Sequence, residues 1–107
     1  MARESDEIVD TIKQAEDYFD QANELVQSDP QAARVLYEKS LNRYLLAASK
    51  RKAPNGYLNY NIGNAYFRLG DIGRAILYYR RAEVFIEGDQ NLEQNLKYAR
   101  TKRQDAF

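Results

Sequence analysis

The feature that most constrains this chain is the stretch from residue 59 to 82, where small and aromatic residues recur at fixed offsets. Gly70 and Asp71 interrupt the stretch: a glycine favours the end of one helix, and an aspartate favours the start of the next. Small side chains let two helices approach closely, and aromatic rings fill the space between them. The residues that carry this pattern are Gly63, Tyr66, Gly70, Ala75, Tyr79 and Ala82. We therefore expect a helix, a tight turn and a second helix packed back on the first.

The rest of the chain also predicts helices. Apolar residues recur every three or four positions between residues 5 and 27, as in an amphipathic helix. Asp29 followed by Pro30 predicts the start of the next helix, and Asp89 can cap the last one. The expected helices cover residues 5–27, 30–49, 57–69, 71–87 and 90–103. The predicted fold class is all-α, with a single domain over residues 1–107. We expect an antiparallel helix–turn–helix array that forms an α-α superhelix. Its helix pairs cover residues 5–49 and 57–87, and a capping helix covers residues 90–103.

Composition argues against most kinds of chemistry. Cysteine and histidine are absent, which removes disulfides, thiol catalysis and the usual zinc sites. Sixteen basic side chains balance sixteen acidic ones, so no net charge attracts nucleic acid or anionic lipid. No apolar run approaches the length that crosses a membrane. Without a nucleophile–base pair or a glycine-rich phosphate loop, we predict no enzyme, no cofactor site and no metal site.

The spacing within residues 59–82 resembles that of a tetratricopeptide repeat (TPR), a helix pair of about 34 residues. The first helix pair matches it more loosely, with Ala22 and Asn23 at the positions of Gly63 and Asn64. Three more equivalent positions follow: Ala33, Tyr37 and Ser40 correspond to Ala75, Tyr79 and Ala82. The two pairs agree only if the turn at residues 28–29 is one residue shorter than the turn at residues 70–71.

Two runs of sequence carry a narrower resemblance. Residues 61–76, and then Asn95 to Arg100, resemble the aerotolerance-operon (BatE-like) TPR proteins of bacteria. This resemblance implies a soluble domain whose parent protein is associated with the membrane of the bacterial envelope. It also implies partner proteins encoded in the same operon, and a complex related to oxygen or stress tolerance.

The helix expected at residues 57–69 has two faces. Its apolar face is expected to lie in the core, and polar residues occupy a wedge of about 100° on the other side. In a TPR stack, the first helix of each pair lines a concave groove, and this wedge would face that groove. The predicted partner-binding residues are Asn23, Tyr57, Tyr60, Asn61, Asn64, Arg68, Asn95 and Tyr98.

Asparagine inside a helix costs about 0.5–0.7 kcal/mol relative to alanine, so asparagines repeated on one face need a reason. Their amides and the nearby tyrosines could hold a partner peptide or helix. Alternatively, the amides bridge neighbouring helices within the stack. Both roles stay open for Asn64, and the groove is favoured for Tyr60 and Asn61. A clamp for a terminal carboxylate is not expected, because Phe19, Asn91 and Asn95 occupy the positions where that clamp has cations.

These observations predict a protein–protein interaction domain that presents an asparagine- and tyrosine-lined groove to a peptide or helix. The alternative is a self-assembly module that forms a weak homo-oligomer through its outer helices, where Leu77 and Val84 are spare apolar residues. The nine tyrosines could stack on nucleic-acid bases. We do not expect this, because most of the neighbouring arginines project from the back of the fourth helix.

Overall fold

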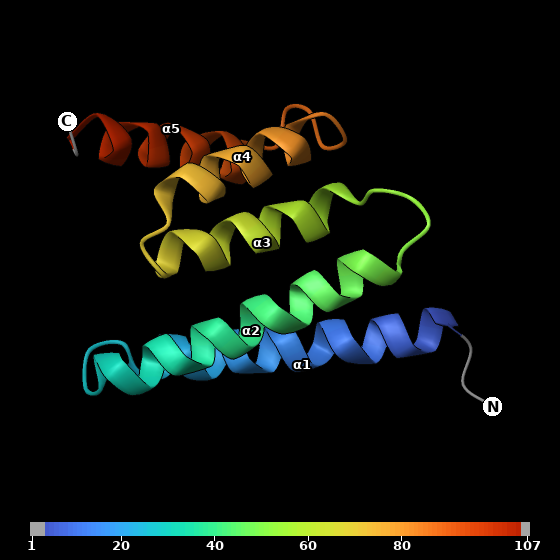
Figure 1. Ribbon diagram of the computed structural model, residues 1–107. Helices are drawn as coiled ribbons and strands as arrows, with labels where there is room; N and C mark the ends of the chain where they lie inside the picture. Colours follow the sequence, from blue (N-terminus) through green and yellow to red (C-terminus); the bar gives the residue numbers. More distant parts are fainter. Residues whose placement is uncertain (1–3, 106–107) are drawn as a thin grey trace. The chain divides into compact units, whose positions relative to one another are not determined.

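The computed structural model describes residues 4–105, which form five α-helices and no β-strand (Figure 1). The helices are α1 (Glu4–Leu25), α2 (Pro30–Lys50), α3 (Gly56–Arg68), α4 (Ile72–Glu83) and α5 (Gln90–Asp105). The predicted all-α class is therefore confirmed. The chain divides after Ala53 into two compact units, one holding α1 and α2 and the other holding α3, α4 and α5.

Four helices begin at a side chain that accepts a hydrogen bond from the backbone. Asp29 Oδ1 accepts from the N–H of Ala32 at 3.1 Å, just before Pro30 opens α2. Asn55, Asp71 and Asp89 do the same for α3, α4 and α5 at 2.9, 3.1 and 3.0 Å. Each such cap contributes about 1 kcal/mol. The sequence pattern predicts the three aspartate caps but not the cap at Asn55.

The turn between α3 and α4 has the hydrogen bonds of a Schellman motif. Gly70 has a left-handed φ of 84°, and its N–H donates to the carbonyl of Phe67 at 3.0 Å. The N–H of Asp71 donates to the carbonyl of Tyr66, also at 3.0 Å. These two bonds satisfy carbonyls at the end of α3 that otherwise lack partners. A tight reversal of chain direction follows, as the sequence predicts.

In the first unit, α1 and α2 pack as an antiparallel pair along small residues (Figure 1). Ala15, Ala22 and Ala33 are at most 1% exposed. Ser40 is fully buried, and its hydroxyl donates to the carbonyl of Ala15 at 2.7 Å. Since a hydroxyl on one helix reaches the backbone of the other, the two helices lie very close together at this point.

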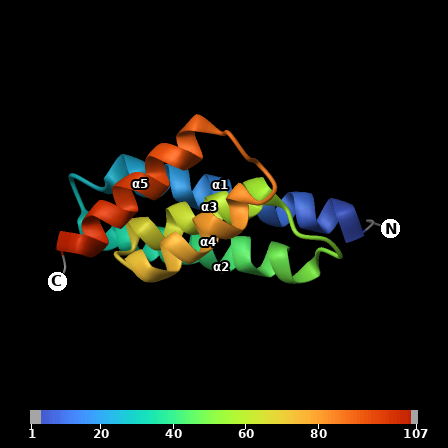
Figure 2. The same cartoon turned by 90° about the horizontal axis from the view of Figure 1, so that it is seen from above.

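In the second unit, the chain reverses from α3 to α4 and again from α4 to α5, which is also visible from above (Figure 2). A buried cluster lies between α4 and α5, with half-buried aromatic residues of α3 packed against it, and Leu58, Ile62 and Ala65 of α3 are also buried. The members of the cluster are Ala75, Ile76, Tyr79, Ala82, Leu92, Leu96 and Ala99. Gly63 faces the Tyr79 ring so closely that a Cβ at this position would lie 2.6 Å from Tyr79 Cδ1. Glycine is therefore required here for α3 to approach α4.

The fourth helix is shorter than the sequence pattern predicts. It ends at Glu83, four residues before the expected end, and a turn leads from there into α5. The N–H groups of Phe85 and Ile86 both donate to the carbonyl of Ala82, at 2.9 and 3.0 Å. Three successive β-branched or aromatic residues, Val84 to Ile86, favour the helix only weakly. The turn places Phe85 Cβ and Ile86 Cγ2 within about 3 Å of where a Cβ on Gly56 would lie.

Two glycines give a matched test of the contact between α3 and α4. Gly63→Ala is expected to lower the free energy of unfolding by about 1–3 kcal/mol, because the new methyl group overlaps the buried Tyr79 ring. Gly73→Ala has nothing within 4 Å of the added carbon and is expected to raise it by up to about 1 kcal/mol through helix propensity. Urea unfolding followed by circular dichroism measures both. Equal effects of the two substitutions would contradict the close approach at Gly63.

Candidate interaction surface on α3 and α5

The same hydrogen bond joins the two helices in both helix pairs. The hydroxyl of Tyr37 on α2 donates to Oδ1 of Asn23 on α1, and the hydroxyl of Tyr79 on α4 donates to Oδ1 of Asn64 on α3, each at 2.5 Å. Both tyrosines are at most 3% exposed. The bonded residues are 14 apart in the first pair and 15 apart in the second. The separation of the bonded residues therefore differs by one residue, as the sequence comparison requires. The expected shorter turn is wrong, because the segment between α1 and α2, residues 26–29, is longer than the segment between α3 and α4, residues 69–71.

In the second unit, this bond belongs to a network that spans three helices. Nδ2 of Asn95 on α5 donates to Oδ1 of Asn64 at 3.1 Å and to the hydroxyl of Tyr60 at 3.0 Å. The ring of Tyr60 lies 6.0 Å from the ring of Tyr79. Asn64 thus bridges α3, α4 and α5, which is one of the two roles that the sequence leaves open for it. Tyr60 is half-buried and is held in place by α5.

Three other residues predicted for the α3 and α5 part of the site are exposed. Tyr57 and Tyr98 are 61% and 53% exposed, and Arg68 is also exposed. Asn61 is half-buried, and its side chain makes no hydrogen bond within residues 4–105. We call the seven residues on these two helices the α3–α5 surface: Tyr57, Tyr60, Asn61, Asn64, Arg68, Asn95 and Tyr98. Asn23 lies on α1, in the other unit, with its amide oxygen already bonded to Tyr37.

Aromatic contacts continue along the same two helices. The ring of Phe67 on α3 lies 5.5 Å from the ring of Tyr98 on α5. The ammonium of Lys102 lies 5.3 Å from the centre of the Tyr98 ring, within range of a cation–π interaction. Phe67 is half-buried, so the exposed Tyr98 packs against a ring that belongs partly to the interior. An aromatic ring supported in this way offers apolar area at little entropic cost.

The charge on this surface is positive. Between Gly56 and Arg68, α3 contains no acidic residue, and Arg68 is its single cation. Lys102 adds a second positive charge beside Tyr98. The surface therefore offers amide donors and acceptors, aromatic rings and one cation, with Lys102 beside it. These groups can bind a peptide backbone and its side chains, and none of them is a nucleophile.

Burial fixes the protonation state of the central tyrosine. Removal from solvent raises the pKa of the Tyr79 hydroxyl well above its ordinary value, and the neighbouring Tyr60 raises it further. The positive charge of Arg68 and the nearby amide of Asn95 lower the pKa, but they do not outweigh burial. Tyr79 therefore keeps its proton at neutral pH and remains the donor to Asn64.

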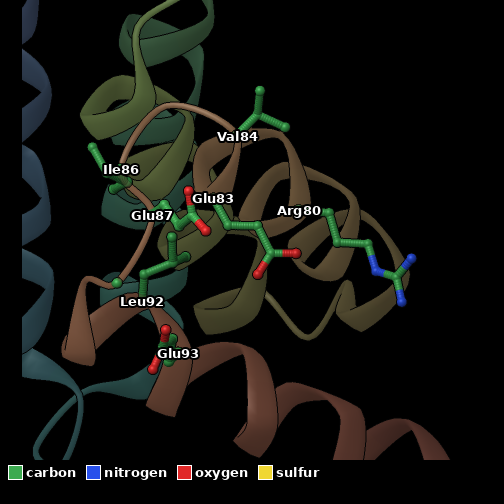
Figure 3. A pocket seen from close by; sticks show the side chains of 8 residues that line it. Arg80, Glu83, Val84, Ile86, Glu87, Leu92 and Glu93 are labelled. Atoms are coloured by element: carbon green, nitrogen blue, oxygen red, sulfur yellow. The ribbon is translucent and has the colours of Figure 1, made fainter.

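A separate hollow of about 320 Å³ lies at the turn between α4 and α5 (Figure 3). Its lining residues are Arg80, Glu83, Val84, Ile86, Glu87, Gly88, Leu92 and Glu93. Figure 3 shows Arg80 extending away from the other labelled side chains. Sequence reasoning missed this hollow because it depends on the early end of α4. Within residues 4–105, no group of histidine, cysteine or acidic side chains is arranged to hold a metal ion.

Comparisons with known proteins add no assignment. No protein-family model and no curated protein sequence matches this chain. None of the helices found in residues 4–105 has the length and apolarity needed to cross a lipid bilayer.

The two neighbouring asparagines of α3 are expected to behave differently. Asn64→Ala should lower the free energy of unfolding by about 1–3 kcal/mol, because the buried Tyr79 hydroxyl loses its acceptor. Asn61→Ala should leave it unchanged or raise it by about 0.5 kcal/mol through helix propensity. Urea unfolding of both variants measures the difference. Equal losses would mean that Asn61 also has a structural role.

Alkaline pH provides an independent test of Tyr79. Its pKa is raised in the folded state, so its contribution to stability is complete below about pH 10, where the unfolded chain keeps its proton, and declines above that pH. Tyr79→Phe cannot ionise. The free energy of unfolding of this variant should therefore fall less steeply between about pH 10 and pH 11, by up to about 1.4 kcal/mol per pH unit. Urea titrations at pH 9, 10 and 11 measure both slopes, and equal slopes would place Tyr79 in contact with solvent.

Proposed function

We propose that this chain is a TPR-type helical-repeat module that binds a protein partner, a peptide or a single helix, on the α3–α5 surface. Two observations support the repeat. The Asn–Tyr bond recurs at equivalent positions of both helix pairs, and the small residues Ala22 and Gly63 precede the two asparagines. The proposed role is recognition without catalysis.

The observation that carries the proposal is the double hydrogen bond from Asn95. It fixes Tyr60 and Asn64 between α3 and α5, with the exposed Tyr57 and Tyr98 and the half-buried Asn61 beside them. Groups that are ordered before binding lose less entropy when a partner arrives. Asn64 uses its amide oxygen in the network, and its Nδ2 group has no partner within residues 4–105. This nitrogen is available to donate to a carbonyl of a bound peptide.

The resemblance of residues 61–76 and of Asn95 to Arg100 to aerotolerance-operon proteins suggests the setting of this role. We propose a complex associated with the bacterial envelope and related to oxygen or stress tolerance, in which the partner is another protein of the same complex. The chemistry of the α3–α5 surface favours a partner segment with free backbone carbonyls and apolar side chains.

A second function is favoured by a different observation. Leu77, on the outer side of α4, is 44% exposed, and Val84, the C-cap residue that follows this helix, is 74% exposed. Exposed apolar residues on one helix face are typical of association between copies of a repeat protein. Self-assembly through outer helices is therefore retained as the alternative function.

A phage-displayed library of random twelve-residue peptides can test the binding surface. Peptides selected on the chain should shift the amide NMR signals of α3 and α5, and the double variant Asn61→Ala/Tyr98→Ala should weaken their binding at least tenfold. The matched control is Leu77→Ala on the outer face of α4, which should bind as the unmodified chain does. Selected peptides whose signals map to α1, or whose binding survives the double substitution, would contradict the proposed surface.

A further inference from the structure

The outer face of α4 is cationic with apolar residues between the cations. Arg74, Leu77, Arg80 and Arg81 of α4 are exposed, on the side opposite to its buried residues, and the C-cap residue Val84 is exposed as well. The guanidinium of Arg81 lies 4.8 Å from the ring centre of Tyr78, and Arg74 pairs with Asp71 at 2.7 Å. These contacts orient two of the three arginines. The single acidic residue within α4, Glu83, is half-buried beside the turn into α5.

The outer face of α1 has the opposite charge. Eight of the 22 residues of α1 are acidic, and Lys13 is its single basic residue. Asp10, Asp17, Asp20 and Glu24 are exposed and follow one another at helical spacing, opposite to the buried residues Ile8, Ala15 and Ala22. Within residues 4–105, none of these four carboxylates takes part in an ion pair.

The two faces also match in spacing. Arg74 and Arg81 are seven residues apart, as are Asp10 and Asp17, and Asp17 and Glu24. Seven residues span about 10.5 Å along a helix axis, so two arginines of α4 can meet two carboxylates of α1 in one alignment. Leu77 and Val84 have the same seven-residue spacing and can cover the apolar Val9, which is 49% exposed on α1.

We propose that the outer face of α4 in one copy of this chain docks on the acidic face of α1 in a second copy. The complementary partner is present in the chain itself, which favours a second copy over an unrelated acidic protein. Residues 1–53 contain eight basic and ten acidic side chains, and residues 54–107 contain eight and six, so the two parts carry opposite net charges. The whole chain is neutral, so no net repulsion opposes association.

The contact is heterologous, because it joins two different surfaces. In a pair of bound copies, one copy has an unused α1 face and the other has an unused α4 face. Further copies can therefore add at both ends, unless the copies close into a ring. Exposed ion pairs are individually weak and are screened by salt, so the assembly is weak and depends on ionic strength. This proposal does not require a ligand on the α3–α5 surface, and either proposal can fail without the other.

Sedimentation equilibrium over a concentration series tests the association directly. In about 0.05 M salt, the weight-average mass of the chain should rise with concentration above the 12.5 kDa of one copy. In about 1 M salt, where the screening length is about 3 Å, it should return to the mass of one copy. A chain that stays at 12.5 kDa in low salt at millimolar concentration would overturn the proposal.

Charge reversal identifies the two faces. Arg80→Glu/Arg81→Glu makes the α4 face acidic, and Asp17→Lys/Glu24→Lys makes the α1 face less acidic, so each variant alone should associate at least tenfold more weakly. An equimolar mixture should associate again, because the basic α4 face of one variant meets the acidic α1 face of the other. Arg74 is left unchanged because its pairing with Asp71 supports the start of α4. Thermal melts confirm that each variant folds.

The matched control is Lys97→Glu/Arg100→Glu on α5, which changes the net charge as much as the α4 variant does at two other exposed positions. It should associate like the unmodified chain. A mixture of the two reversed variants that stays monomeric, or a control that loses association equally, would overturn the pairing of α1 with α4. Binding of a monomeric chain to phosphatidylserine vesicles, lost in the α4 variant, would assign this face to an anionic membrane instead.

Discussion

A hydrogen bond between a tyrosine hydroxyl and an asparagine amide holds each helix pair in register. The tyrosine ring fills the space between the helices, and its hydroxyl must find a partner because it lies at a buried interface. Asn23 and Asn64 supply that partner at the same relative position in their pairs. A small residue precedes each asparagine, and in the second pair the absence of a Cβ at Gly63 leaves room for the Tyr79 ring. Helix spacing and helix register thus depend on the same contact.

The candidate binding surface depends on that contact. Asn64 receives Tyr79 from α4 and Asn95 from α5, so the bond that fixes one helix pair also positions the next helix. Tyr60 is held by the same Asn95. The accessible residues of the surface therefore lie beside a polar network rather than on a flexible segment. A partner that binds there would contact side chains whose neighbours are already ordered.

Much of this fold can be predicted from the sequence, because its determinants are local. Asp29, Asp71 and Asp89 cap helices, and Gly70 ends one, for reasons contained in a few neighbouring residues. The end of α4 could not be predicted in this way. Apolar periodicity continues to Ile86, and the contact of the turn with Gly56 joins residues about 30 apart in sequence. The role of Asn64 was open for a similar reason, since a helical projection gives the direction of a side chain but not the neighbour it meets.

The two helix pairs differ by one residue in the separation of their bonded asparagine and tyrosine, and the adjacent Tyr78 and Tyr79 show the consequence. A constant offset that equates Asn23 with Asn64 would equate Tyr37 with Tyr78, which is also a tyrosine. Tyr78 instead stacks near Tyr66 and Arg81, and Tyr79 alone reaches Asn64. The number of residues between the bonded asparagine and tyrosine can therefore vary while the interhelical contact is retained. An insertion or deletion between the two residues is tolerated when the helices can shift along each other and form the same contact. Related repeats are therefore better aligned by their Asn–Tyr pairs than by a fixed period.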